Sequence, residues 1–125
     1  MIDHVSLAVR DLARAAAFYE RLLAPLGYAK LVERPATVGF GKKYPELWLN
    51  LRADTGAAPA NPGAHVALRA ANEEAVRAFH TAALAGGGAS DGAPGPRQAA
   101  MTTYFGAFVL DLDGNKVEAL SFPAA

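Results

Sequence analysis

Three histidines are the first residues to consider in this 125-residue chain, because the sequence contains no cysteine. Without thiolates, a metal ion must be held by imidazole nitrogens and by oxygen ligands. His4 and His65 begin two similar segments, HVSLA and HVALR, that lie 61 positions apart. A single strand histidine is more often a structural residue, so the repetition is what singles out this pair. Two imidazoles with one carboxylate and open coordination positions suit iron(II), manganese(II), nickel(II) or zinc(II).

The similarity between the two halves extends beyond the histidine segments. Phe18 matches Phe79 and Gly27 matches Gly88 at the same offset of 61 positions. A strand, a helix and a terminating glycine therefore recur in register, which is typical of a tandem duplication. A module of this size buries only about 60% of the surface that its unfolded chain exposes, so each half is marginal alone and we expect the halves to pair.

Length, composition and charge are those of one compact domain. The chain is 52% apolar and carries 12 basic and 12 acidic residues, so its net charge is zero and offers no cationic field to nucleic acid or to an anionic membrane. No apolar run reaches the roughly 18 residues of a spanning helix, and the first residues do not resemble a secretory signal. We therefore predict a cytoplasmic protein that binds neither nucleic acid nor membrane. The domain spans residues 1–125, with modules of about 1–60 and 61–125.

Each module predicts the element order βαβββ. Asp11 and Asn72 are the expected N-caps of the two helices, and glycines end both helices, at Gly27 and within 86–88. Asp113-Gly114 predicts a hairpin turn between the last two strands. The expected strands run over residues 2–9, 29–33, 37–40 and 47–52 in the first module, and over 64–69, 104–110 and 116–122 in the second.

One strand of the second module is hardly visible in the sequence. By analogy with the first module it should lie near residues 89–91, but the whole stretch from Gly86 to Met101 is rich in Gly, Ala and Pro. So long a stretch is unusual for an ordinary connection. It predicts a long loop that is either a mobile lid or a loose surface segment.

Alternation along the strands separates an apolar face from a polar one. Val5, Leu7 and Val9 share one face of the first strand, and Leu47, Leu49 and Leu51 share one face of the fourth. These apolar faces must cover the helices. The opposite, polar face of the sheet is predicted to carry His4, Ser6, Trp48, Asn50, Arg52, His65, Arg69, Lys116 and Glu118.

These segments in this order resemble the vicinal oxygen chelate superfamily, which includes glyoxalase I, extradiol dioxygenases, methylmalonyl-CoA epimerase, fosfomycin-modifying thiol transferases and bleomycin-resistance proteins. The resemblance rests on HVSLAV followed by DLARAAAFYERLLAPLGY, then on LWLNL, HVAL and FVLDLDGNKVEAL. It implies an α+β fold in which two tandem βαβββ modules form a cupped, incomplete eight-stranded barrel with the helices outside. It also implies one divalent metal ion in the cup, often within a homodimer.

On the positions that match the family's motif, the resemblance places the metal ligands at His4, His65 and Glu118. Asn50 stands where glyoxalase I has a glutamate that binds metal and helps to move a proton, and Ala8 stands where it has an arginine for glutathione. Both departures argue against glyoxalase activity. Three ligands resemble the two-histidine-one-carboxylate site of extradiol dioxygenases or the three-ligand site of the thiol transferases.

Five residues on the polar face are candidate substrate contacts. Trp48 predicts a pocket wall, because its neighbours already occupy the core side, although a core role is the common alternative. Asn50 either orients a bound oxygen or bonds to a neighbouring strand side chain. Two arginines either meet an acidic group or are exposed at the rim. The full set is Ser6, Trp48, Asn50, Arg52 and Arg69.

The candidate catalytic residues are Glu118 and Tyr104, the latter as a proton donor near the predicted lid. They lead to the hypothesis of a metal-dependent enzyme of lyase, isomerase or dioxygenase type that acts on a small, oxygen-chelating substrate. The first alternative is a metal-free protein that binds or sequesters a small molecule, as bleomycin-resistance proteins do. A further alternative is a fosfomycin-type thiol transferase, because Trp48 and Ser6 stand where those enzymes have a tryptophan and a threonine.

Overall fold

The computed structural model describes residues 1–53 and 63–123, and the two halves of the chain have the same element order. The first module contains β1 (Val5–Val9), α1 (Leu12–Leu23), a short 3-10 turn (Ala24–Leu26), β2 (Ala29–Glu33), β3 (Thr37–Gly41) and β4 (Pro45–Leu51). The second contains β5 (Val66–Arg69), α2 (Glu73–Ala85), β6 (Ala89–Gln98), β7 (Thr103–Leu110) and β8 (Lys116–Ser121).

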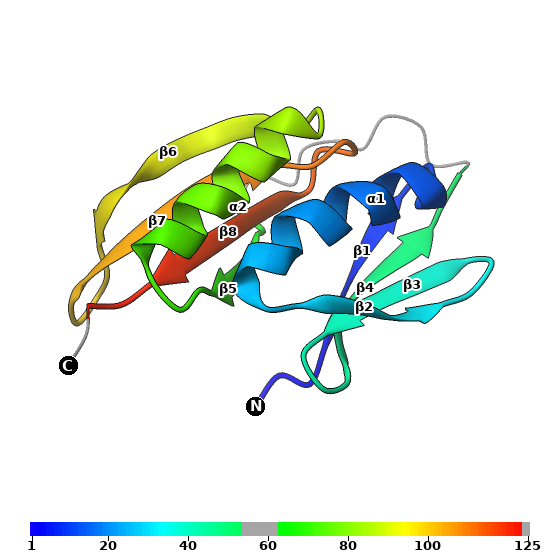
Figure 1. Ribbon diagram of the computed structural model, residues 1–125, viewed down its shortest axis with the longest axis horizontal. Coiled ribbons are helices and arrows are strands. Elements are labelled where there is room, and N and C mark those ends of the chain that lie inside the picture. Colours follow the sequence, from blue (N-terminus) through cyan, green and yellow to red (C-terminus); the bar gives the residue numbers. More distant parts are fainter. Residues whose placement is uncertain (54–62, 124–125) are drawn as a thin grey trace.

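Each module forms one four-stranded mixed sheet, and the two sheets have equivalent strand orders, β1-β4-β3-β2 and β5-β8-β7-β6. The pairs β1–β4 and β5–β8 are parallel, and the other neighbours are antiparallel. α1 and α2 lie side by side on the same side of the two sheets (Figure 1). No ladder joins the sheets in the described part of the chain, so the barrel is unclosed. The predicted α+β fold of two tandem modules is confirmed.

The helix boundaries follow from the capping residues that the sequence predicted. The Asp11 carboxylate accepts a hydrogen bond from the Arg14 amide at 3.1 Å, and Asn72 Oδ1 accepts one from the Ala75 amide at 2.9 Å. Gly27, with φ of 86°, adopts the left-handed conformation that ends the first helical segment. Both predicted N-caps are confirmed.

Two strand boundaries differ from the prediction because of pairing. β1 starts at Val5 rather than at residue 2, since its parallel partner first pairs there, through Leu47. His4 therefore precedes the strand. In the same way β5 starts at Val66, which pairs with Val117, so His65 lies just before its strand. Alternation in sequence marks a strand's faces but not the residue at which its partner begins.

The prediction of a long loop from Gly86 to Met101 is wrong. This stretch contains β6, a ten-residue edge strand that pairs with β7 along most of its length. An edge strand tolerates prolines because one side of its backbone needs no partner. Register shifts between Ser90 and Gly92 and between Gly92 and Gly95 absorb the irregular residues as bulges. The described structure therefore places a strand, rather than a lid, beside Tyr104.

A single apolar core lies between the helices and the sheets. Tyr19 and Phe79, from the two helices, are fully buried, as are Leu47 and Leu49 on β4. The core side of β4 is thus the one that the alternation predicted. The opposite faces of both sheets carry the polar residues, and the helices do not cover them.

A buried aspartate in the β7–β8 turn connects the two modules. Asp111 Oδ2 accepts a 2.5 Å hydrogen bond from the Tyr19 hydroxyl on α1. Its Oδ1 accepts from the backbone amides of Asp113 at 2.9 Å and Asn115 at 2.8 Å. Burial, and then the neighbouring Asp111, raise the pKa of Tyr19 well above its usual value, so Tyr19 remains a hydrogen-bond donor.

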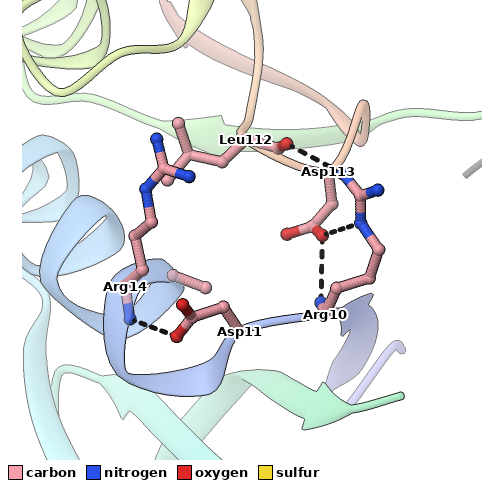
Figure 2. Close-up of a pocket in the computed structure, with 6 residues that line it drawn as sticks. Arg10, Asp11, Arg14, Leu112 and Asp113 are labelled. Atoms are coloured by element: carbon pink, nitrogen blue, oxygen red, sulfur yellow. Dashed lines mark hydrogen bonds and ion pairs between the residues drawn. The ribbon is translucent and has the colours of Figure 1, made fainter. Parts of the chain in front are cut away.

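The same turn also holds the end of β1, as Figure 2 shows. Asp113 accepts from the Arg10 backbone amide at 2.9 Å and from Arg10 Nε at 3.0 Å. The side-chain amide of Asn115 donates to the Ala8 carbonyl at 3.0 Å. The segment from Asp111 to Asn115 is therefore a structural joint between modules, and Gly114, with φ of 90°, permits its tight turn.

Candidate functional site

The strongest polar constellation lies on the face of the second sheet that α2 does not cover. His65 Nε2 and Glu118 Oε1 are 3.2 Å apart. Glu118 is only 3% exposed, and its other oxygen, Oε2, is the one buried side-chain polar atom of the described residues that has no hydrogen-bond partner. A buried carboxylate oxygen without a partner is costly, which points to a ligand that completes it.

Three strands position this pair. Glu118 on β8 lies between Ala67 on β5 and Phe108 on β7 in the sheet register. The Phe108 ring meets the His65 ring edge to face, with ring centroids 5.5 Å apart. This aromatic contact fixes the imidazole beside the carboxylate and shields it on one side.

Tyr104 and Glu118 share the space above Gly106. A Cβ atom at position 106 would lie 2.9 Å from Tyr104 Cε2 and 3.0 Å from Glu118 Oε2, so only glycine leaves room for both groups. Burial raises the pKa of Tyr104, and so does the Glu118 carboxylate, toward which the Tyr104 hydroxyl can donate and whose charge adds to the shift, while Arg97 opposes part of it. Tyr104 therefore keeps its proton at neutral pH, next to the candidate site.

His4, the other predicted ligand, lies apart from this pair. Its Nδ1 is 2.7 Å from Asp3 Oδ1, and its side chain is 53% exposed. Among the described residues of one chain, no group of three His, Asp or Glu side chains is arranged to hold a metal ion. One chain thus brings together two of the three predicted ligands, and the complete three-ligand site stays a prediction.

The candidate substrate contacts of the first module lie on the corresponding face of their sheet. Trp48 is half-buried and covers Gly39, where a Cβ would come within 2.9 Å of its ring. Asn50 Oδ1 accepts a 2.8 Å hydrogen bond from Thr37 Oγ1, the strand-neighbour bond that the sequence offered as one alternative. Ser6 is exposed and pairs with Trp48 across β1 and β4. An aromatic wall and neighbouring polar groups are thus present together.

The two predicted arginines lie at strand ends. Arg52, just beyond β4, donates to the Leu51 carbonyl at 2.8 Å. The Arg69 guanidinium lies 4.7 Å above the centroid of the Phe122 ring. Both residues are exposed, and their role as substrate contacts stays a prediction.

The third histidine has a structural explanation. His80 on α2 is half-buried and forms a 2.8 Å hydrogen bond through Nε2 to Ser90 Oγ on β6. Burial lowers the pKa of His80. This contact joins the helix to the edge strand and lies outside the His65–Glu118 pair.

The donor set of the second module fits a divalent metal ion. An imidazole nitrogen and a carboxylate are ligands for iron, manganese, nickel and zinc, and Glu118 Oε2 has its acceptor capacity unused. Phe108 provides the apolar surroundings that favour charge interactions at such a site. Two protein ligands leave the set incomplete, so a further nitrogen or oxygen ligand is required.

Duplicated βαβββ modules with a polar face opposite the helices define a class of cup-forming α+β proteins. The model of the Glyoxalase/Bleomycin resistance protein/Dioxygenase superfamily matches residues 1–119, and the chain belongs to this superfamily. No curated protein sequence matches the chain. Within the described residues, no helix is long and apolar enough to cross a membrane.

Three solved structures are similar to this chain over nearly its whole length. A glyoxalase/bleomycin resistance protein from Albidiferax ferrireducens T118 is 29% identical, with a TM-score of 0.85, and the match covers 95% of this chain and 97% of that one. Lactoylglutathione lyase from Agrobacterium tumefaciens is 22% identical, with a TM-score of 0.65 and coverages of 97% and 92%. TioX from Micromonospora sp. ML1 is 15% identical, with a TM-score of 0.64 and coverages of 98% and 96%. The latter two share the fold.

Proposed function

We propose that this chain is a metal-dependent enzyme that acts on a small molecule with neighbouring oxygen atoms. Glu118 carries the proposal, because its carboxylate is buried, lies 3.2 Å from His65 and has one oxygen without a partner. A structural carboxylate would be expected to use both oxygens within the protein. His65 and Glu118 would hold the metal ion from the second module, and His4 is the proposed third ligand.

We propose that His4 comes from a second copy of the chain, in a homodimer. His4 is exposed, and no helix covers the faces of the two sheets opposite α1 and α2 (Figure 1). Apposing the first module of one copy and the second module of another would cover both faces. It would also place Trp48 opposite the His65–Glu118 pair. An isologous dimer forms two such cups, because each copy contributes one module to each cup.

The residues around the cup define its chemistry. A bound divalent ion supplies a Lewis acid that stabilises negative charge on a substrate oxygen. Tyr104, which lies beside Glu118, would donate a proton, while Trp48 would pack against the apolar part of the substrate. Ser6, Asn50, Arg52 and Arg69 are the proposed polar contacts. This residue set supports a lyase, isomerase or dioxygenase type of reaction.

Metal content tests the proposal. Protein purified without chelator or affinity tag should contain close to one equivalent of iron, manganese, nickel or zinc per chain, and a His4→Ala, His65→Ala double variant should contain little. His80→Ala serves as the control, because it removes a histidine that has a structural partner. Elemental analysis after reconstitution with each ion provides the measurement. Equal, negligible metal in wild type and double variant would contradict the proposal.

The alternative function is metal-free binding of a small molecule. It is favoured by the lack of a three-ligand group within the described part of a single chain, and by the aromatic wall at Trp48. The His4→Ala, His65→Ala variant distinguishes the two functions. If Trp48 fluorescence still reports ligand binding to metal-free protein, the chain is a binding protein, whereas joint loss of metal and ligand supports the enzyme.

A further inference from the structure

Arg97, on β6, is held rigidly on the same sheet face as Glu118. Its Nη1 donates to the backbone carbonyls of Gly95, at 2.9 Å, and of Gly106. Its Nη2 donates to the carbonyl of Ala93 at 2.8 Å. The guanidinium also lies 5.2 Å from the centroid of the Phe108 ring. Three hydrogen bonds and a cation–π contact thus fix a side chain that is usually flexible.

Glycines provide the space in which this guanidinium lies. A Cβ atom at position 92 would come within 2.9 Å of Arg97 Nη2 and 3.0 Å of Phe108 Cδ2. Gly106, which accepts from Arg97 through its carbonyl, also leaves the room occupied by Glu118 Oε2. Gly106 on β7 therefore lies between the Arg97 guanidinium and the Glu118 carboxylate, the candidate metal ligand.

No carboxylate of the described residues forms an ion pair with Arg97. The neighbouring cation, Lys116, lies 4.7 Å from the same Phe108 ring centroid but is paired with Asp91 at 3.0 Å. Arg97 has five N–H groups, and three donate to carbonyls, which leaves Nε–H and one Nη2–H. Donors on two nitrogens of one planar guanidinium match the two oxygens of a carboxylate.

We propose that Arg97 is the anchor of a carboxylate subsite, so that the substrate of this cup carries a carboxylate group. Phe108 holds the guanidinium from one side, and the other cation beside this ring, Lys116, is already paired with Asp91. The inference rests on the proposed function for the identity of the cup, but the subsite itself belongs to the second module alone.

Benzoate and benzamide test the subsite, because the two probes have nearly the same shape and differ in charge. Calorimetric titration of the full-length protein should show that wild type prefers benzoate, and Arg97→Gln should reduce this preference roughly tenfold. The ratio of the two dissociation constants within one variant cancels general losses of folded protein. Benzoate, but not benzamide, should also shift the Arg97 Nε–H signal in the NMR spectrum.

Two further variants complete the test. Arg77→Gln is the matched control, because Arg77 also lies over a phenylalanine, 4.8 Å from the Phe105 ring centroid, but is an exposed residue of α2. It should leave the preference unchanged. Arg97→Lys should restore only part of the preference, since an ammonium lacks the planar pair of donors.

The proposal of a carboxylate subsite is contradicted if wild type binds neither probe at millimolar concentration. It is also contradicted if Arg97→Gln and Arg77→Gln prefer benzoate over benzamide to the same extent. The titrations are run with and without zinc, so that the two proposals fail separately. A benzoate preference that depends on Arg97 in protein that binds no zinc supports the subsite and contradicts the metal-dependent function. Zinc binding that is normal while Arg97→Gln keeps the full preference contradicts the subsite alone.

Discussion

Replacing Asp111 with alanine is expected to lower the free energy of unfolding by about 3 kcal/mol or more. The Asp111 carboxylate accepts hydrogen bonds from the Tyr19 hydroxyl and from the backbone amides of Asp113 and Asn115. Tyr19 is completely buried, so its hydroxyl would lose its partner without gaining water. The β7–β8 turn would also lose the contacts that hold it against the first module.

Urea unfolding, followed by circular dichroism, measures this effect as a shift in midpoint at constant slope. Tyr19→Phe removes only one donor and should cost about 1 kcal/mol. Asp3→Ala, at an exposed position beside His4, is the control and should change the free energy of unfolding by less than about 0.5 kcal/mol. A loss below about 1 kcal/mol for Asp111→Ala would contradict the role of the turn as the joint between modules.

Replacing Glu118 with glutamine is expected to weaken zinc binding by roughly 100-fold or more, because it removes a charged ligand while preserving shape. The stability of the metal-free protein should be unchanged or higher. The buried carboxylate has an oxygen without a hydrogen-bond partner, and a neutral amide is less costly to bury. Weaker zinc binding without lost stability is the signature of a ligand residue rather than a structural one.

Competition with a chromophoric chelator measures zinc affinity, and thermal unfolding of the metal-free protein measures stability. Glu33→Gln is the matched control, because Glu33 is exposed on β2 and pairs with Lys30 at 2.9 Å. It should leave zinc affinity unchanged. If Glu118→Gln destabilised the metal-free protein and left zinc affinity intact, Glu118 would be a structural residue and the proposed centre would be wrong.

The sequence predicted those parts of the fold whose signals are local. Asp11 and Asn72 marked the helix starts because N-capping uses bonds within one turn. The alternation of Leu47 and Leu49 with Trp48 marked the faces of β4 because a strand has a strict period of two. Repetition at a fixed offset then predicted that both modules share one topology, which the strand orders confirm.

Signals that depend on distant partners were missed. β6 has no β-branched residue, and its pairing with β7, rather than its own composition, makes it a strand. Arg97 was overlooked for the same reason, since it lay within the predicted loop. The sequence marks Arg97 only as a basic residue a few positions before a predicted strand. The buried joint of Tyr19 and Asp111 spans 92 positions, and no local pattern announces such a contact.

The candidate site was likewise predicted only in part. His65 and Glu118 were predicted as ligands, and the parallel pairing of β5 with β8 brings them within 3.2 Å. His4 was predicted to join them, but it lies at an exposed position before β1. Strand alternation indicates the face on which a histidine lies. It contains no information about which other groups complete a site around that histidine.

In the proposed dimer, one metal site combines His4 of one copy with His65 and Glu118 of another. Zinc content of a mixed dimer, formed by co-expressing His4→Ala and Glu118→Gln chains with separable tags, tests it directly. One of the two cups in this dimer would contain all three ligands, so about half an equivalent per chain is expected. Each variant purified alone should contain little zinc. A mixed dimer with as little zinc as either variant alone would contradict a site shared between copies.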